Sequence, residues 1–503
     1  MNARAVALLV VLAVLPFLPG LRHDFVFDDH GAITANTFYR QPDAWARIAT
    51  LETYREPRLL DGTRPVLLAS VLIERALGAR AAWQHRPLNY ALHAGCALLL
   101  FGWVRGLLRR AGRRSPEASA FAAALVFALH PLALEPVQVP SYREDLLALF
   151  FILAALAAAP LRRAAVRIPI QTLAIFFALG SKETAFVLPL FLAWTWLCLP
   201  AERPAWRHGA IAMTIACAAT GLVAALVLIH HAPQATAGPW NGISLQWPAN
   251  LWTAPRLFAD YLRLLAAPWP LCADRVVTPI PHPWALVVAG GVLALALALL
   301  PRALRRQPLL VFAAGWLVIA FLPVSNLVPL HNPFADRYAY ALLPGWALFA
   351  AALPLEDRVF RRGLGVLLAA YVLLVQLRLP DWRNDAHLWS ATLRVEPRSA
   401  RAHSGLGVAA LEQGALESAR RYFERADELN PQDVTALVNL AVLDGQQGAV
   451  EESARKLEAA VQRRPDKAEA WANLAVVREL QGRRDEALDA AERAASLDPL
   501  RRW

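Results

Sequence analysis

Charged side chains are scarce in this sequence. They make up 18% of its 503 residues, whereas about a quarter of the residues in a typical soluble domain are charged. Apolar residues take their place at 57% of the chain, and they are gathered into long runs. This composition excludes a soluble globular protein of this length and predicts an all-α, polytopic membrane protein.

Cysteine is also rare, with four residues in the whole chain. No two of them form a Cys-x-x-Cys pair, and three lie inside apolar runs. The pattern therefore argues against a disulfide framework and against a cysteine-based zinc site. The four residues are Cys96, Cys198, Cys217 and Cys272.

The apolar runs predict about eleven membrane spans. They lie at roughly 5–21, 87–104, 118–135, 144–160, 168–180, 184–199, 209–230, 284–300, 308–324, 338–354 and 363–379. The stretch from Trp252 to Pro268 is apolar but is interrupted by charges, so we interpret it as interfacial or re-entrant.

The net charge of +11 comes largely from arginines at the ends of these runs. They occupy every other connection, which is a signal of membrane topology, and we therefore expect no nucleic-acid partner. By the positive-inside rule these connections and the N-terminus are cytoplasmic, and the C-terminal region lies on the outer, periplasmic or lumenal side. The arginines are Arg105, Arg109, Arg110, Arg113, Arg114, Arg162, Arg163, Arg167, Arg203, Arg207, Arg302, Arg305, Arg306, Arg358, Arg361 and Arg362.

The remaining connections carry polar clusters, and the predicted topology places all of them on the outer side. Each cluster alone is also explained by an interfacial ion pair or by a helix cap. Their shared side favours a functional site. The candidate residues are Asp28, Asp29, His30, Glu135, Arg143, Asp145, Lys182, Glu183, His331, Asp336 and Arg337.

The pair Asp28-Asp29 opens the first outside loop, residues 22–85, directly after the first span. Adjacent carboxylates can divide roles, because one raises the pKa of its neighbour. A catalytic aspartate in this loop is one interpretation, and a solvated loop with a helix cap is the other.

From residue 381 onward the long apolar runs stop and a 34-residue repeat begins. Proline keeps this period at Pro397, Pro431, Pro465 and Pro499, and glycine keeps it at Gly414, Gly448 and Gly482. The period is typical of tetratricopeptide repeats, each a pair of helices. We expect a membrane domain over 1–380 and an α-solenoid of three repeats over 381–503. Such a solenoid binds protein partners or acts only as a packing module.

Taken together, the segments resemble the transmembrane-and-tetratricopeptide-repeat O-mannosyltransferases, which have the GT-C fold of lipid-sugar-dependent glycosyltransferases. The resemblance covers nearly the whole chain. One motif departs from the family, because Asp336-Arg337 stands where Glu-Arg is usual. The motifs are Phe27-Asp28-Asp29, His85-x-x-x-Asn89-x-x-x-His93, His130-Pro131 with Glu135, Arg143-x-Asp145, Ser181-Lys182-Glu183, Pro323-Val324-Ser325-Asn326 and Asp336-Arg337-Tyr338-x-Tyr340.

The resemblance implies transfer of a mannose-like hexose, with inversion, from a polyprenyl-phosphate donor to a hydroxyl acceptor on protein. Asp28 or Asp29 would accept the proton of the hydroxyl, with Asp28 favoured. Arg337 and Lys182 would bind the phosphate, with Arg143 and His331 as weaker candidates. Membrane lipid and a protein or peptide held by the repeats are the expected partners. The resemblance demands no metal, and a divalent cation at Asp28-Asp29 stays open as an alternative.

Two other functions fit the same sequence. A non-catalytic membrane scaffold would use the repeats to recruit partners, and its loop carboxylates would be replaceable. A transporter would place charges near the middle of its spans. Most polar clusters lie at span ends instead, and His93, the main exception, is predicted to make a hydrogen bond between packed helices.

Overall fold

A computed structural model describes residues 3–56, 59–161, 163–199, 206–231, 248–330 and 332–497. The chain divides into two compact units. The first comprises Met1–Ala235, Leu245–Leu271 and Pro279–Arg383. The second contains, among the described residues, Cys272–Thr278 and the chain from Asn384 onward.

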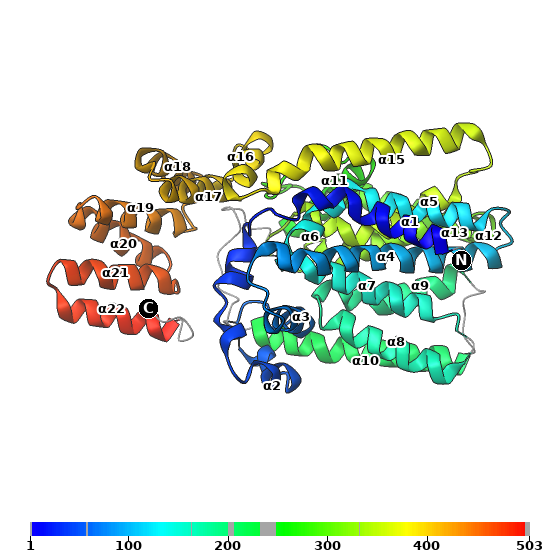
Figure 1. The fold of residues 1–503 in the computed structure, drawn as a ribbon, viewed down its shortest axis with the longest axis horizontal. Coiled ribbons are helices and arrows are strands. Elements are labelled where there is room, and N and C mark those ends of the chain that lie inside the picture. The colour runs from blue at the N-terminus through cyan, green and yellow to red at the C-terminus, as the bar shows by residue number, and fades with distance from the viewer. Residues whose placement is uncertain are drawn as a thin grey trace. The chain divides into compact units, whose positions relative to one another are not determined.

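The described residues of the first unit form helices joined by loops, and Figure 1 shows its long helices running side by side. Its α-helices are α1 (Ala3–Val14), α2 (Ala44–Ala49), α3 (Pro65–Ala76), α4 (Ala82–Arg110), α5 (Pro116–Leu129), α6 (Leu134–Gln138), α7 (Arg143–Ala158), α8 (Ala164–Leu179), α9 (Leu188–Cys198), α10 (Trp206–His231), α11 (Ala249–Ala266), α12 (Trp284–Arg306), α13 (Pro308–Phe321), α14 (Leu343–Ala352) and α15 (Arg358–Arg378).

Each of the eleven predicted spans coincides with a helix of this unit. In the described part of the chain, four helical stretches are long and apolar enough to cross a membrane: Ala3–Gly20, Ala82–Arg110, Trp284–Arg306 and Arg358–Trp382. Four more apolar helices are shorter. The predicted all-α fold class is therefore confirmed, while the count of eleven spans stays a prediction.

One predicted span differs in shape. The run 118–135 is not one straight helix, because α5 ends at Leu129 and the chain bends by 54° before Pro131–Gln138. Pro131 is the physical reason, since a proline cannot donate the next helical hydrogen bond and disfavours helical geometry in the preceding residue. His130 at the bend is extended, and Glu135 follows within the second limb.

Helix α4 is the centre of the unit and packs against α1, α5 and α7. His93 lies on its buried face, and its ring nitrogens bond the Tyr340 hydroxyl at 2.9 Å and the Ala128 carbonyl at 3.0 Å. These are the helix-packing bonds expected of this residue.

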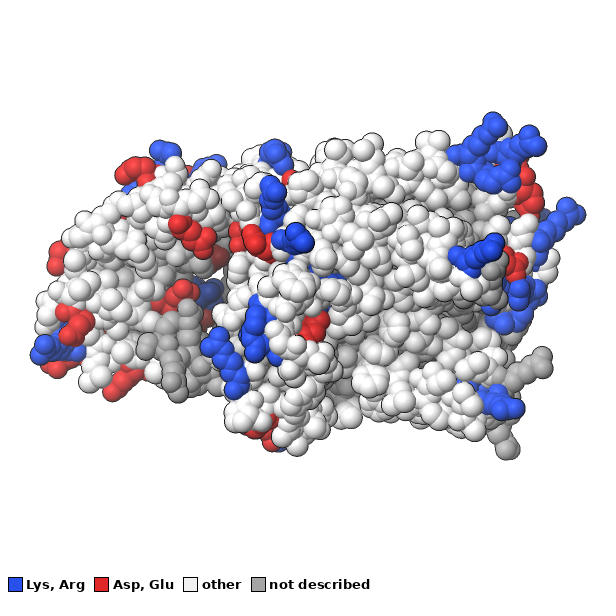
Figure 2. All heavy atoms as spheres, viewed as in Figure 1, with Lys and Arg blue, Asp and Glu red and all other residues white. Residues whose placement is uncertain are grey.

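The two ends of the first unit differ in charge. At one end the turns after α4 and α14 meet, where the Arg113 guanidinium donates to the Ala352 carbonyl at 3.2 Å. Figure 2 shows basic side chains gathered at this end, all of them arginines by the sequence, with an almost uncharged surface along the helices. From His85 to Arg105 α4 rises about 30 Å, roughly the thickness of a bilayer's hydrocarbon core. Among the candidate residues, Arg143 lies at the other end, where it donates to the His85 carbonyl near the start of α4.

The second unit is a helical repeat. Helices in equivalent positions of successive repeats confirm the predicted 34-residue period. Gly414, Gly448 and Gly482 follow the first helix of each pair, with φ angles of 73°, 82° and 76°. Only glycine adopts this left-handed conformation freely. The helices are α16 (Asp385–Val395), α17 (Ala400–Glu412), α18 (Leu416–Leu429), α19 (Thr435–Gln446), α20 (Val450–Arg463), α21 (Ala468–Leu480) and α22 (Arg484–Leu497).

The segment Cys272–Thr278, which follows α11 in the sequence, is built into this second unit. The Ser399 hydroxyl donates a hydrogen bond of 2.6 Å to the buried Asp274 carboxylate, and Ser399 also caps α17. The first repeat therefore contains a segment that lies more than a hundred residues earlier in the chain.

Candidate functional site

The adjacent carboxylates Asp28 and Asp29 have different surroundings. Asp29 is fully buried, and its oxygens accept the backbone N–H groups of Ser141 at 2.8 Å and Val26 at 3.3 Å. Burial raises the pKa of Asp29 to about 6, although these N–H groups favour the ionised form. Asp28 is half-buried, and it accepts the Tyr142 hydroxyl at 2.8 Å. Asp29 thus ties the loop down, while Asp28 faces the other site residues.

The backbone before this pair is strained. Phe27 has a φ of 53°, which is unusual for a residue with a side chain. Such conformations persist where the surrounding structure holds them, and they occur often at functional sites. The side chains of the next two residues, Asp28 and Asp29, contact different parts of the protein. His30 is exposed at the start of a short π-helical turn.

Arg86 of α4 fixes the chain that leads into this loop. Its buried guanidinium donates to the backbone carbonyls of Asp24 at 2.6 Å, Gln138 at 2.8 Å and Leu21 at 3.1 Å, and also to that of His23. Arg86 was not among the sequence candidates. A charged residue next to an apolar run was the signal that would have found it.

Arg337 lies beside Tyr142, the residue whose hydroxyl donates a hydrogen bond to Asp28. Its guanidinium carbon is 3.9 Å from the centre of the Tyr142 ring, a cation–π distance, and its Nη1 is 3.3 Å from the Glu135 carboxylate. The buried Nε of Arg337 has no hydrogen-bond partner among the described residues. Asp28, Tyr142, Arg337 and Glu135 are therefore linked in a chain, and Tyr142 was not a sequence candidate.

Lys182 belongs to a second, buried group of charges. Its ammonium bonds Asp145 at 2.7 Å and Glu144 at 2.9 Å. Burial alone would lower the pKa of Lys182, but these two carboxylates raise it. Its Nζ is 5.4 Å from the centre of the Tyr338 ring, and the Arg337 guanidinium is 5.2 Å from the same centre. The two cations therefore share one aromatic neighbour.

Arg64 extends this group from the first outside loop. It pairs with Asp61 at 2.7 Å, with Glu144 at 2.5 Å and with Glu183 at 3.2 Å. Glu183 also accepts the Thr63 hydroxyl at 2.7 Å. Glu183 is thus held by the loop rather than presented to a ligand, and Arg64 is a site residue that the sequence analysis missed.

Arg143 is fully buried, and its five N–H groups all have partners within the protein. It donates twice to Glu74 at 2.9 Å, and it bonds Asn89 at 2.8 Å, Ser70 at 3.0 Å and the His85 carbonyl at 2.9 Å. No N–H remains for a phosphate in this arrangement. We therefore remove Arg143 from the phosphate candidates and give it a structural role.

The last sequence candidates are His331 and Asp336. His331 lies outside the described residues. Asp336 is buried at the start of the 3-10 turn Asp336–Leu342, and it lines a small pocket together with Glu135, Arg378 and Trp382.

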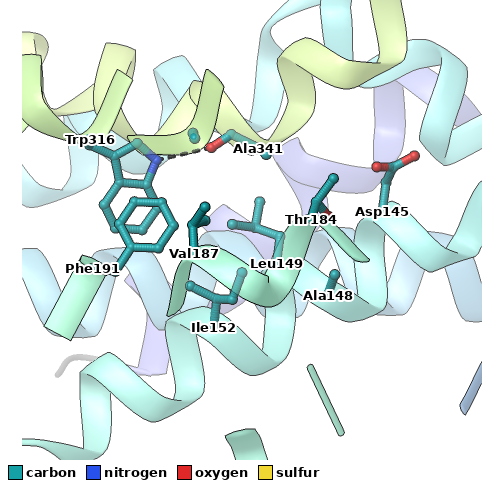
Figure 3. A pocket seen from close by; sticks show the side chains of 10 residues that line it. Asp145, Ala148, Leu149, Ile152, Thr184, Val187, Phe191, Trp316 and Ala341 are labelled. Carbon is teal, nitrogen blue, oxygen red and sulfur yellow. Dashed lines mark hydrogen bonds between the residues drawn. The ribbon is translucent and has the colours of Figure 1, made fainter. Parts of the chain in front are cut away.

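A small, narrow apolar pocket begins at Asp145 (Figure 3). Asp145 lies at one end in this view, and Trp316 and Phe191 pack together at the other with ring centres 4.2 Å apart. Leu149, Ile152 and Val187 line the space between them. The pocket thus has one charged end and an apolar body.

Within the described residues, no three histidine, cysteine, aspartate or glutamate side chains are grouped as metal ligands. Both oxygens of Asp29 already accept backbone N–H groups. A divalent cation at Asp28-Asp29 stays a prediction.

The repeat region is similar to a known protein family. The family model described as tetratricopeptide repeat matches residues 377–434 and 438–501. The repeats are tetratricopeptide repeats. The crystal structure of MamA covers 29% of this chain at 19% identity with a TM-score of 0.21, which is too low to support an argument.

Most of the chain is also similar to curated proteins. Protein O-mannosyl-transferase F38B6.6 of Caenorhabditis elegans is 24% identical over 449 residues, covering 85% of this chain and 63% of that protein. Protein O-mannosyl-transferase TMTC4 of Mus musculus is 26% identical over 500 residues, covering 82% and 64%. The resemblance expected from the sequence is confirmed. The chain spans less than two thirds of the length of these relatives.

Proposed function

We propose that this protein is an integral membrane glycosyltransferase that transfers a mannose-like hexose from a polyprenyl-phosphate donor to a protein hydroxyl. The observation that carries the proposal is the linked set Asp28–Tyr142–Arg337, in which a carboxylate accepts the tyrosine hydroxyl and a guanidinium lies over the ring of the same tyrosine. The names of the relatives, protein O-mannosyl-transferases, support the same activity.

Asp28 acts as the general base. A hydroxyl is a weak nucleophile, so its proton passes to the Asp28 carboxylate as its oxygen attacks the anomeric carbon. The new glycosidic bond forms on the face opposite the phosphate, and the bond from the anomeric carbon to the phosphate oxygen breaks. The configuration is inverted, and the electron pair leaves with the lipid phosphate.

Arg337 stabilises the departing phosphate. Its buried Nε–H has no hydrogen-bond partner in the described part of the chain, so it offers a charge-assisted hydrogen bond to an incoming oxygen. Lys182 is paired with Asp145 and Glu144, and it contributes by exchanging one of these partners for the phosphate. Arg337 is therefore the principal phosphate ligand in this proposal.

The apolar pocket beside Asp145 supports a lipid donor. Its walls are formed by apolar side chains such as Leu149, Ile152 and Phe191, the kind of surface that an isoprenoid chain would contact once the pocket widens. The arginine-rich end of the first unit supports a cytoplasmic side there and a site on the outer, periplasmic or lumenal side.

The tetratricopeptide repeats present the protein acceptor. Each repeat packs mainly on its neighbours, so a chain ending at Pro431 keeps the first repeat and the Ser399–Asp274 bond. We expect this shortened chain to transfer hexose to a short serine- or threonine-containing peptide but to lose transfer to a folded protein acceptor. Unchanged transfer to both would contradict acceptor presentation by the repeats.

The activity is tested with the purified full chain in detergent or vesicles. The probes are polyprenyl-phosphate mannose with a radiolabelled sugar and a peptide library that contains serine and threonine. We expect label on peptide hydroxyls and release of polyprenyl phosphate in equal amounts. A folded protein that binds the donor and releases neither product would contradict the proposal.

A further inference from the structure

One oxygen of the Asp145 carboxylate is buried without a hydrogen-bond partner. Its Oδ1 accepts the Lys182 ammonium at 2.7 Å, whereas its Oδ2 has no partner among the described residues. The side chain is 4% exposed. A buried carboxylate oxygen is costly to leave unsatisfied, so this atom is available to a hydrogen-bond donor group on a bound ligand.

The pocket around Asp145 defines the chemistry of that group. The unpartnered oxygen needs a hydrogen-bond donor, and the pocket beyond it is apolar along Ala148, Leu149 and Ile152. A phosphodiester is ionised at neutral pH and has no proton to donate, and its negative charge repels a carboxylate. In the proposed donor, the group that can supply this hydrogen bond is therefore a sugar hydroxyl that lies close to the phosphate.

The proposed donor has one hydroxyl that meets this requirement. Lys182 joins Asp145 to the phosphate site, because its ammonium contacts Asp145 and shares the Tyr338 ring with Arg337. In a lipid-phosphate hexose, the phosphate is attached at the anomeric carbon. The hydroxyl nearest to the phosphate is therefore the one on the neighbouring carbon, C2.

We propose that Asp145 accepts a hydrogen bond from the C2 hydroxyl of the donor hexose and is a specificity-determining residue for the sugar. This inference rests on the proposed transferase activity. Glu144 provides the comparison for a residue that pairs with Lys182 but does not contact the sugar. It also contacts Lys182, at 2.9 Å, but it does not line the pocket.

The test compares polyprenyl-phosphate mannose with its 2-deoxy analogue as donors for the full chain. A hydrogen bond to a charged group predicts that wild-type kcat/KM favours the hydroxylated donor by about tenfold to a hundredfold. In Asp145→Asn and Asp145→Ala this preference falls to within about threefold. Glu144→Gln is the matched control, and it keeps the wild-type preference even where its overall rate is lower.

Binding provides a second measurement that does not depend on turnover. The dissociation constants of the two donors, obtained from their thermal stabilisation of each variant, should show the same loss of preference at Asp145. Retained preference in both Asp145 variants, or an equal loss in Glu144→Gln, would overturn the assignment. Equal use of both donors by the wild type would overturn it while leaving the transferase intact, whereas a wild type that transfers neither sugar would contradict the proposed function itself.

Discussion

The Arg143–Glu74 pair of the membrane unit and the Arg425–Glu428 pair of the repeats differ in burial. In the first unit Arg143 and Glu74 are buried, and their partners come from separate helices and loops. In the repeats a pair such as Arg425–Glu428 lies within one helix, with side chains 52% and 65% exposed. Breaking a buried ion pair strongly destabilises the folded protein, whereas an exposed pair contributes little to its stability. We therefore expect the Arg143–Glu74 pair to hold the architecture of the first unit, whereas the exposed Arg425–Glu428 pair contributes little to the stability of the repeats.

This comparison is tested most strongly by removing one buried charge. Glu74→Gln keeps the size of the side chain but leaves the Arg143 guanidinium buried without its counter-charge. We expect a loss of about 3–5 kcal/mol in the free energy of unfolding, measured by chemical denaturation in detergent. Glu428→Gln is the matched control in the repeats and should cause no measurable change. Similar small losses in both variants would contradict the difference between the two regions.

The pH dependence of stability tests the buried Asp29. Its pKa is raised from 3.8 to about 6 in the folded state because it is buried. The folded protein therefore holds this proton more tightly than the unfolded chain does. The stabilisation is fully present below about pH 4 and is lost as the pH rises through about 6, with a total of roughly 3 kcal/mol.

Asp29→Asn should lack this part of the pH dependence, measured as the difference in unfolding free energy from wild type between pH 4 and 7. The exposed Asp43 lies on the same loop, and Asp43→Asn serves as the control that keeps the wild-type curve. If the Asp29→Asn and wild-type curves were parallel, the burial of this carboxylate would not affect stability.

A smaller effect is expected from Arg337→Lys. The charge is kept, but the planar guanidinium and its Nε–H are lost, so the phosphate loses a directed hydrogen bond. We expect kcat/KM to fall by about tenfold to a hundredfold, measured with the labelled donor. Arg113→Lys at the arginine-rich end is the matched control and should retain wild-type transfer. Wild-type kinetics in Arg337→Lys would remove this residue from the phosphate site.

The repeats were predictable in detail because their signals are local. The 34-residue spacing of Gly414, Gly448 and Gly482 reflects the left-handed residue that ends each first helix, and it needs no knowledge of distant contacts. The helices of the membrane unit were also predictable, since long apolar runs form helices in a bilayer. The bend at His130 is explained by Pro131, which follows it directly in the sequence.

The candidate site was predictable only as a set of residue types. The different surroundings of Asp28 and Asp29 depend on the backbone N–H of Ser141, which lies 112 positions away. Arg143 resembled a phosphate ligand because its partners Glu74 and Ser70 come from a separate helix. Such pairings are set by tertiary packing, and a single sequence does not reveal them.

The central claim is that Asp28 is the base and that Asp29 holds the loop. The most direct measurement compares the turnover of Asp28→Asn and Asp29→Asn with a radiolabelled polyprenyl-phosphate mannose, at temperatures matched to the stability of each variant. Loss of a general base predicts that Asp28→Asn lowers turnover by about a hundredfold to ten-thousandfold while donor binding is kept, and that Asp29→Asn lowers it less. Near-normal turnover in Asp28→Asn would contradict the account.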